Sequence, residues 1–258
     1  MIRSMYSGIS GMKGFQTKLD VIGNNIANVN THGFKKGRVM FQDLMSQQMQ
    51  SALAPGANQG GVNPQQVGTG STVGAIDTVH GEGPAQYTGR SLDLMMNGAG
   101  FFAVQSNGET YYTRAGNFYI DSNNNIVNSS GAYLLNQAGE RIEVPEDATE
   151  VTIDSEGTIN FVGSDAPGTT LQVATFANPD GLTKVGGNLF SATAASGAPN
   201  ITDTNGAGEV QSGFLEMSNV DLTDEFTEMI VAQRGFQANS RVITTSDEIL
   251  QEIVNLKR

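Results

Sequence analysis

The sequence contains few of the residue types that usually form catalytic or metal sites, and their spacing matches no known site of either kind. His32 and His80 are the only histidines and there is no cysteine, so a Ser-His-Asp triad or a zinc site has almost no raw material. Residues 121–125 (DSNNN) match the start of a calcium-binding loop, but Ile126 stands where that loop needs glycine and Ala132 where it needs glutamate. Carboxylates are plentiful, yet no spacing singles out a catalytic pair. We therefore predict no catalytic, cofactor-binding or metal-binding residue and no enzyme activity.

The composition argues against partners with negatively charged surfaces. Of the 258 residues, 26 are acidic and 14 are basic, which gives a formal net charge of −12. Such a chain repels nucleic-acid phosphates and anionic lipids. No segment approaches the ~20 apolar residues of a membrane span, and the N-terminus lacks the apolar stretch of a secretory signal peptide. We expect neither nucleic-acid binding nor membrane insertion. The absence of cysteine suits a reducing compartment and equally suits a chain that is exported unfolded.

Both ends of the chain predict long helices. All seven prolines lie between Pro55 and Pro199, so neither end contains the strongest helix breaker. Near the N-terminus, apolar residues recur at steps of three, four and seven: Ile2, Met5, Ile9, Met12, Leu19 and Ile26. The C-terminal repeat is the most regular in the sequence: Leu222, Phe226, Met229, Phe236, Ile243, Leu250 and Val254. We predict paired coiled-coil-type helices within residues 1–33 and 218–258, the second running from about residue 220 to 256.

Neither helix is self-sufficient by its composition. Gly8, Gly11, Gly14 and Gly23 interrupt the first helix and Gly235 the second, and each glycine costs about 1 kcal/mol relative to alanine. Isolated helices are marginal in water even without glycine. The small residues also let another helix approach closely. The two helices therefore either associate with neighbouring chains or pack on the protein's own domain, and periodicity alone does not choose between these arrangements.

Between the helices the pattern changes twice. Residues 34–75 contain little bulky apolar material beyond residue 46 and predict an extended linker. Residues 76–217 alternate short β-type runs with turn residues such as Asn107-Gly108, and they hold most of the aromatic residues. We predict an all-β domain in this part of the chain. The fold class is therefore α+β, with paired terminal helices and a central all-β domain.

Three blocks of the sequence carry a resemblance to a known family. They are SGISGMKGFQTKLDVIGNNIANVNTHGFKK (residues 7–36), LDLMMNGAGFFAV with YYTRAGNFYIDSNNNIVNSSGAYLL (residues 92–104 and 111–135), and the stretch from residue 213 to 258 that contains MIVAQR. In this order they resemble the bacterial flagellar rod and hook family. The resemblance implies terminal helices that form the inner tube of a hollow helical polymer, with the β domain outside.

The resemblance implies a mechanical function. The expected function is that of a hook subunit, which self-assembles into a curved hollow tube and transmits motor torque to the filament as a universal joint. The alternative is a distal-rod subunit, a drive shaft in the basal body. The implied partners are other copies of the chain, distal-rod and hook–filament junction proteins, the hook cap and the flagellar export apparatus. The implied location is the extracellular hook or basal body, reached through the export channel without a cleaved signal peptide.

A competing hypothesis from another class is a secreted carbohydrate-active or carbohydrate-binding β protein with helical tails. The chain has no tryptophan, which leaves such a protein without its best sugar-stacking side chain.

The helical repeats supply the expected assembly interface: Met5, Ile9, Met12, Leu19, Ile26, Leu222, Phe226, Met229, Phe236, Ile243, Leu250 and Val254. A second group is expected at the end of the first helix and the start of the linker: Asn24, Asn25, Asn28, Asn30, Gly33 and Phe34. Asparagine at a helix end satisfies local backbone groups and tolerates left-handed conformations. A polar turn without special contacts is the alternative for this group.

Overall fold

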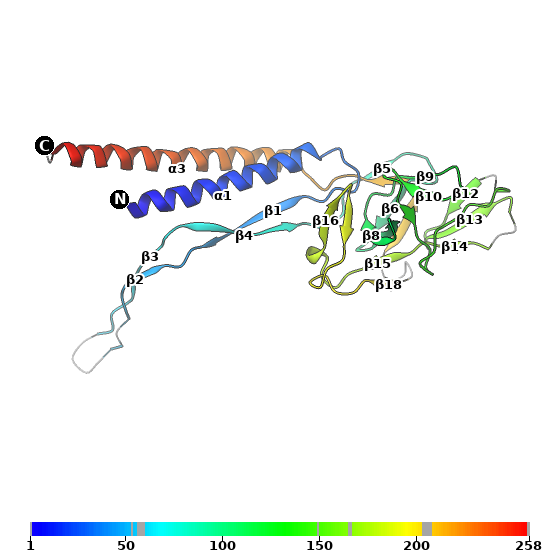
Figure 1. The fold of residues 1–258 in the computed structure, drawn as a ribbon, viewed down its shortest axis with the longest axis horizontal. Coiled ribbons are helices and arrows are strands. Elements are labelled where there is room, and N and C mark those ends of the chain that lie inside the picture. The colour runs from blue at the N-terminus through cyan, green and yellow to red at the C-terminus, as the bar shows by residue number, and fades with distance from the viewer. Residues whose placement is uncertain are drawn as a thin grey trace. The chain divides into compact units, whose positions relative to one another are not determined.

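The computed structural model describes residues 2–52, 54–55, 60–148, 150–164, 167–202 and 208–256. The chain forms two compact units, each built from segments that are far apart in sequence (Figure 1). Unit 1 comprises Met1–Ile26, Gly37–Asp77 and Asp221–Arg258, and unit 2 comprises Ala27–Lys36 and Thr78–Val220. Unit 1 holds the two long helices and unit 2 holds the main β-sheet. The predicted α+β fold class is confirmed.

Among its described residues, unit 1 contains two helices and four strands: α1 (Ile2–Ala27), β1 (Gly37–Asp43), β2 (Gln47–Gln50), β3 (Gln65–Val67), β4 (Ser71–Thr78) and α3 (Leu222–Leu256). The last residues of α1 and β4 belong to unit 2. Strand β1 pairs with β4, and β2 pairs with β3. These strands occupy the segment for which the sequence predicts only an extended linker. Extended backbone needs hydrogen-bond partners for its N–H and C=O groups, and strand pairing provides them. The composition of the segment does not reveal this pairing.

Helix α3 has a clear start signal. The Asp221 carboxylate accepts a hydrogen bond from the N–H of Thr223 (2.8 Å), which caps the helix, and Asp224 and Glu225 occupy the first turn. Helix α1 ends at Ala27, earlier than the sequence boundary at residue 33. A turn follows in which the N–H of Thr31 donates to the carbonyl of Asn28 (3.1 Å).

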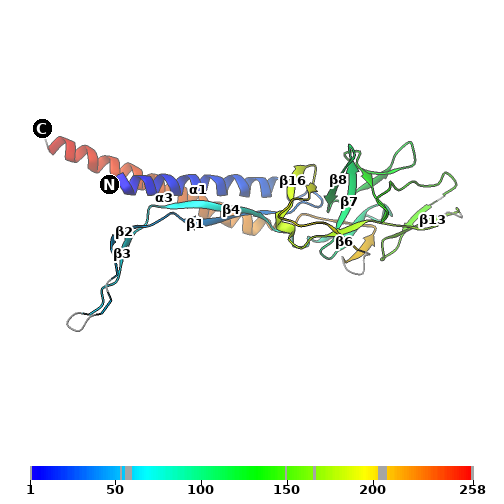
Figure 2. The ribbon, with the colours of Figure 1, turned by 60° about the horizontal axis from the view of Figure 1, so that its bottom comes forward.

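The helices α1 and α3 lie side by side, and glycines allow the close approach (Figures 1 and 2). A Cβ atom on Gly11 would lie 2.7 Å from Nδ2 of Asn239, and one on Gly235 would lie 2.5 Å from Cζ of Phe15. The fully buried residues of α3 are Glu225, Ala232 and Ser246. They recur at multiples of seven residues and are small or polar, unlike the predicted apolar repeat. The contact with α1 also includes Ile243 of that repeat, because its Cγ1 would lie 3.4 Å from a Cβ atom on Gly8.

Unit 2 is built from short strands: β5 (Ala85–Tyr87), β6 (Leu94–Asn97), β7 (Phe101–Ser106), β8 (Glu109–Thr113), β9 (Phe118–Ile120), β10 (Ile126–Asn128), β11 (Tyr133–Leu134), β12 (Glu150–Ile153), β13 (Thr158–Val162), β14 (Thr169–Thr170), β15 (Val173–Thr175), β16 (Thr183–Gly186), β17 (Leu189–Ser191), β18 (Asn200–Thr202), β19 (Glu209–Ser212) and β20 (Phe214–Glu216), with a 3₁₀ turn η1 (Pro179–Gly181). The largest sheet has nine strands: β16, β17, β8, β7, β11, β10 and β9 in order, with β15 on β7 and β18 on β15. Smaller ladders join β12, β13 and β14, then β6 with β19, and β5 with β20.

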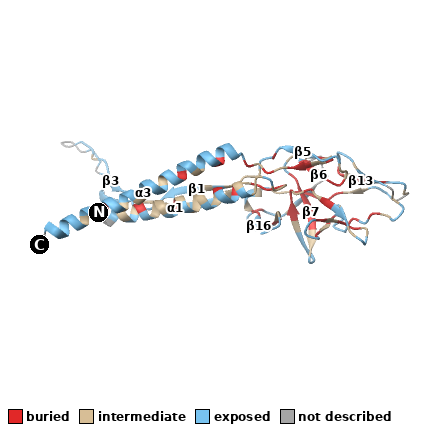
Figure 3. Ribbon diagram, turned by 90° about the horizontal axis from the view of Figure 1, so that it is seen from above, coloured by how far each residue is buried: buried red, intermediate tan, exposed pale blue. Residues whose placement is uncertain are grey.

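Strand β7 is the centre of the core. Phe102 and Val104 belong to one buried cluster, whereas Phe101 and Ala103 belong to a second cluster on the other face of the strand. All four residues are 0% exposed, as a continuous apolar run in a strand covered on both faces predicts. Figure 3 shows this burial along β6 and β7, whereas most of α3 is exposed. The Asn107-Gly108 turn then joins β7 to β8 with positive φ at both residues (53° and 88°), as predicted.

The helix contact at Gly235 is testable with a matched pair of substitutions. Alanine favours a helix by about 1 kcal/mol over glycine, but at position 235 the new methyl group would meet the Phe15 ring at 2.5 Å, and overpacking costs about 1–3 kcal/mol. Among the described residues, nothing lies within 4 Å of the equivalent point on Gly23. We expect Gly235→Ala to lower, and Gly23→Ala to raise, the temperature at which helical circular dichroism is lost. If Gly235→Ala and Gly23→Ala stabilised the protein equally, Gly235 would not be in close contact with Phe15.

Candidate assembly surface and buried charge cluster

Helix α3 exposes apolar side chains along its whole length. It spans 35 residues, or roughly 52 Å at the α-helical rise, and its exposed apolar residues are Leu222, Phe226, Ile230, Val231, Phe236, Val242, Ile249, Ile253, Val254 and Leu256. These side chains lie on several sides of the helix, so they are available for burial by more than one further chain. We refer to these ten residues as the α3 apolar surface.

The residues predicted as the assembly interface are accessible to different degrees. On α3, Leu222, Phe226, Phe236 and Val254 are exposed and Met229, Ile243 and Leu250 are half-buried. On α1, Ile9 is exposed and Met5, Met12, Leu19 and Ile26 are half-buried. None of these twelve described residues is fully buried, so all of them retain surface for a further chain.

Asn25 joins three segments of unit 1. It lies inside α1 and is 1% exposed. Its Nδ2 donates to the carbonyl of Gly37 (2.9 Å) and to Oε2 of Glu225 (3.1 Å), and its Oδ1 accepts from the N–H of Gly37 (2.9 Å). One side chain thereby connects the end of α1, the start of β1 and the start of α3. The prediction of a helix-end role did not include this partner on α3.

The other predicted asparagines lie near the surface. Asn24 and Asn30 are exposed, whereas Asn28 is half-buried. The Oδ1 atom of Asn28 accepts a hydrogen bond from the hydroxyl of Thr31 (3.1 Å). The structure therefore places the four asparagines in different surroundings and does not gather them into one site.

Gly33 and Phe34 lie inside unit 2. Gly33 has φ of +68°, and a Cβ atom there would lie 2.5 Å from the backbone nitrogen of Ala115, so only glycine fits. Its N–H donates to the backbone carbonyl of Glu216 (2.8 Å). Phe34 is 8% exposed, and Nζ of Lys184 lies 5.0 Å from the centroid of its ring. This short segment is therefore held tightly against the β domain.

A buried charge cluster follows directly in the chain. Nζ of Lys35 lies 2.5 Å from Oε1 of Glu216, and Nη1 of Arg114 lies 3.6 Å from Oε2 of the same carboxylate. The side chains of Lys35 and Glu216 are 0% exposed and that of Arg114 is 1% exposed. Two cations thus share one carboxylate, away from water. We call Lys35, Arg114 and Glu216 the charge cluster.

Backbone groups complete the charge cluster. Nζ of Lys35 also donates to the carbonyl of Gly81 (2.7 Å), and the N–H of Gly83 donates to Oε1 of Glu216 (3.0 Å). The guanidinium of Arg114 donates to two backbone carbonyls, those of Met96 (3.2 Å) and Gly98 (2.5 Å). Because these contacts come from segments around residues 35, 82, 97, 114 and 216, the cluster holds together five parts of unit 2 that are far apart in sequence.

Burial and charge oppose one another in the cluster. Burial lowers the pKa of Lys35 below its usual value, and attraction to Glu216 works against that decrease. Burial likewise lowers the pKa of Arg114, and Glu216 again opposes it. Among the described residues, no hydrogen-bond partner reaches Nε of Arg114 or Oε2 of Glu216. Removing one member of such a buried set leaves an uncompensated charge, which is strongly destabilising.

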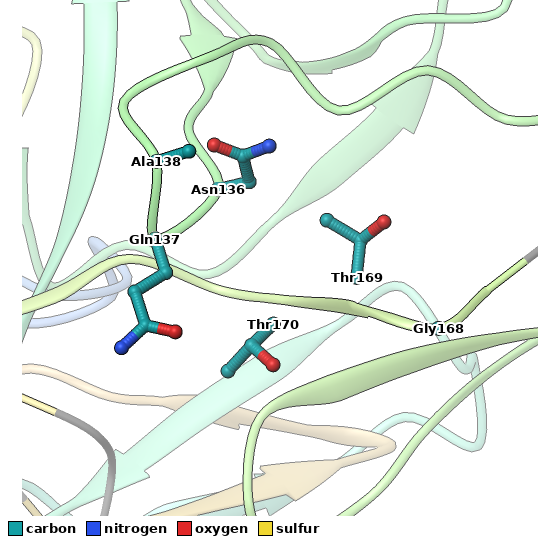
Figure 4. Close-up of a pocket in the computed structure, with 6 residues that line it drawn as sticks. All are labelled: Asn136, Gln137, Ala138, Gly168, Thr169 and Thr170. Carbon is teal, nitrogen blue, oxygen red and sulfur yellow. The ribbon is translucent and has the colours of Figure 1, made fainter.

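Neither the histidines nor the open pocket offers a catalytic arrangement. The His80 ring packs against Phe101 and Phe190, with centroids 5.6 and 5.5 Å apart, and burial lowers its pKa to about 4. The pocket in Figure 4 has a volume of about 440 Å³, and the residues that line it are uncharged: Asn136, Gln137, Ala138, Gly168, Thr169 and Thr170.

In the part of the chain that the structure describes, no group of three or more His, Asp or Glu side chains could hold a metal ion. No described helix has the length and apolar character needed to cross a membrane.

Sequence reasoning missed the charge cluster. The available signal was a charged residue at the edge of an apolar or aromatic run, as in GFK at Lys35, YYTR at Arg114 and GFLE at Glu216. Each position is unusual for a lone charge, because lysine, arginine and glutamate are almost never fully buried unless paired. Nothing local indicates that the three belong together, because Lys35 and Glu216 are 181 residues apart.

Comparison with known proteins follows the same three blocks. The model "Flagella basal body rod protein" matches residues 5–35, "Flagellar hook protein FlgE/F/G D1 domain" matches residues 95–161, and "Flagellar basal body rod FlgEFG protein C-terminal" matches residues 211–256. The chain is 56% identical to the flagellar basal-body rod protein FlgG of Bacillus subtilis over 264 residues, covering 100% of both chains. The chain belongs to the flagellar rod and hook family. As a member of this family it is a structural flagellar protein.

Rod and hook relatives differ in how they align to this family member. FlgG of Caulobacter vibrioides is 38% identical over 265 residues, covering 99% of this chain and 100% of the relative. The flagellar hook protein FlgE of Borreliella burgdorferi is 29% identical over 441 residues, covering 100% of both chains. Because this chain has 258 residues, the hook relative contains a large region with no counterpart here.

The charge cluster predicts unequal effects for its members. Glu216→Gln leaves two buried cations without their carboxylate and is expected to cost about 3–5 kcal/mol. Lys35→Met leaves the Arg114–Glu216 pair neutral overall, so its cost should be smaller. Urea unfolding of the full chain, followed by near-ultraviolet circular dichroism, measures both. The control Glu209→Gln changes an exposed carboxylate and should stay within about 0.5 kcal/mol of the parent protein. A Glu216→Gln variant as stable as this control would contradict the role of the cluster.

Proposed function

We propose that this protein is a distal-rod subunit of the flagellar basal body, a segment of a straight drive shaft. The observation that carries the proposal is the full-length alignment with rod relatives of the same size, which extends over 264 residues with 56% identity. The hook function expected first from the sequence has weaker support, since the alignment with a hook relative extends over 441 residues at 29% identity. The second of the two sequence-based alternatives is therefore preferred.

The α3 apolar surface supports self-assembly as the means of building the shaft. Helix α1 contacts α3 at Glu225, Gly235 and Ile243, while Ile230 (58% exposed) and Val231 (56% exposed) remain in contact with water. Further copies of the chain would cover them. A shaft of indefinite length requires heterologous contacts that do not close into a ring, so different faces of the helix pair must meet in neighbouring copies.

Export and neighbouring components form part of the same proposal. The chain would leave the cell through the flagellar export apparatus, directed by its N-terminal part, and would polymerise beyond it. Its partners would be other copies of itself along the shaft and the adjoining flagellar components at either end. The hook cap and hook–filament junction proteins belong to the hook hypothesis and are not partners in this proposal.

Gold labelling of isolated flagella distinguishes the rod from the hook. The chain contains no cysteine, so Ser122→Cys in the exposed turn between β9 and β10 provides one labelling site. In cells that produce only this variant, biotin and streptavidin-gold are expected on the straight shaft of isolated basal bodies in electron micrographs. Gold confined to the curved external segment would overturn the rod assignment in favour of the hook.

A second substitution in the same labelled chain tests the assembly surface. Phe226 is 50% exposed, and aspartate near a helix N-terminus suits the helix dipole, so Phe226→Asp should leave the monomer folded. The labelled Phe226→Asp chain is expected to be absent from the shaft, with loss of motility. The control Gln237→Asp, also exposed on α3, should incorporate normally. Normal incorporation of Phe226→Asp would exclude Phe226 from the interface.

A further inference from the structure

Unit 2 carries a high negative charge, which opposes the packing of many copies side by side. Its segments contain 16 Asp and Glu against 6 Lys and Arg, a net charge of −10, out of −12 for the whole chain. Copies packed along a shaft would repel one another through these surfaces at short range. Any cation of unit 2 that remains available to a second copy therefore matters for assembly, and the structure shows where each of the six lies.

Three of the six cations are already paired with a carboxylate within unit 2. Lys35 and Arg114 are buried in the charge cluster, and Arg90 lies 3.5 Å from the Asp93 carboxylate. No carboxylate of the described residues lies within 4.0 Å of Arg141, Lys36 or Lys184. Arg141 lies between Glu140 and Glu143 in an acid-rich segment, so Lys36 and Lys184 are the cations outside that segment that are left for an external partner.

Lys184 differs from Lys36 because it borders a pocket. The pocket has a volume of about 160 Å³ and lies between the segment of residues 28–35 and the β16–β17 hairpin. Nζ of Lys184 donates one hydrogen bond, to the backbone carbonyl of Lys35 (3.0 Å), and lies 5.0 Å from the centroid of the Phe34 ring. An ammonium group has three donors, so donors remain for a ligand. Burial lowers the pKa of Lys184, and no carboxylate opposes that decrease.

The backbone of the hairpin turn shapes the rest of the pocket. Gly186, Gly187 and Asn188 all have positive φ (109°, 60° and 59°) and line the pocket. Gly187 and Asn188 form the turn itself, outside the β16–β17 ladder. Backbone N–H groups in turns of this kind attract anions. The pocket therefore combines an ammonium group without a carboxylate partner and a glycine-rich turn, in a space that suits one small anionic group.

We propose that this pocket receives a carboxylate side chain from unit 2 of a second copy. The expected donor is the acid-rich segment at residues 140–156, which contains seven exposed acidic residues and a single basic one: Glu140, Glu143, Glu146, Asp147, Glu150, Asp154 and Glu156, with Arg141. This inference rests on the proposed function, because it requires copies to lie next to one another. Charge complementarity identifies the occupant: each copy is rich in carboxylates and has few cations to receive them.

The pocket and the acidic segment lie at opposite ends of unit 2. In Figures 1 and 2, β16 lies at one end of the unit, and β13, which follows the acidic segment, lies at the other. The contact therefore joins the head of one copy to the tail of the next and cannot form within one copy. It is a heterologous contact, which continues along a polymer and does not close on itself. Each contact would also remove one acidic charge from the repulsion between neighbouring units.

Zero-length cross-linking of the full-length protein tests the contact. A carbodiimide joins an amine to a carboxylate only where the two groups touch, and mass spectrometry identifies the joined peptides. In the polymer we expect the Lys184 peptide joined to a peptide from residues 140–156, and in the monomer we expect no such product. A polymer that lacks this product would overturn the inference.

Matched lysine variants give a second measurement. Lys184→Gln removes the charge from the pocket, and we expect the critical concentration for polymerisation to rise about twofold to fivefold, the range of a partly exposed ion pair. Lys36→Gln removes the other available cation, which does not border the pocket, and should leave the critical concentration unchanged. An equal rise in critical concentration for both variants would show that polymerisation depends on the net charge of unit 2 and not on the pocket, and would overturn the inference.

The two proposals fail in different ways. A chain that forms no polymer in solution and is absent from isolated basal bodies overturns the proposed function and this inference together. A polymer that assembles without the Lys184 cross-link, or as readily with Lys184→Gln as without it, overturns the pocket contact alone.

Discussion

A long helix with apolar side chains on several sides cannot be satisfied by one partner helix. Helix α3 has 35 residues, and α1 contacts it at Glu225, Gly235 and Ile243. The α3 apolar surface is left in water, at a free-energy cost that grows with each exposed side chain. Glycines at positions 8, 11 and 235 allow the close approach of the two helices but weaken each helix on its own. Under the proposed function, further chains would supply the burial that unit 1 lacks.

Unit 2 differs from unit 1 because it buries most of its large apolar side chains in its own core. Strand β7 is buried on both faces, and the charge cluster holds the incoming segment at Lys35 and the outgoing segment at Glu216 to the same sheet. The Asn25 network has a similar role in unit 1, where it connects α1, β1 and α3. Buried polar contacts of this kind join segments that are far apart in sequence, and breaking one of them leaves a buried polar group without its partner.

The sequence predicted what periodicity and turn chemistry determine. The heptad pattern placed the C-terminal helix to its last residue, Leu256, and the Asn107-Gly108 pair identified the first hairpin. It did not predict that β1 would pair with β4 and β2 with β3, because most of that segment lacks the apolar alternation of a strand. It also did not predict that Asn25 would meet Glu225, 200 residues away. Contacts between distant polar residues leave no local pattern, whereas apolar burial repeats along an element and can be recognised from one segment alone.

Hydrogen–deuterium exchange of the full chain, as monomer and as polymer, tests the central claim most directly. The claim is that the terminal helices depend on neighbouring copies, whereas unit 2 does not. Amides of α3 should therefore exchange much faster than those of β7 and β8 in the monomer and become protected on polymerisation, while β7 and β8 change little. Amides of α3 that are as protected in the monomer as in the polymer would contradict the account.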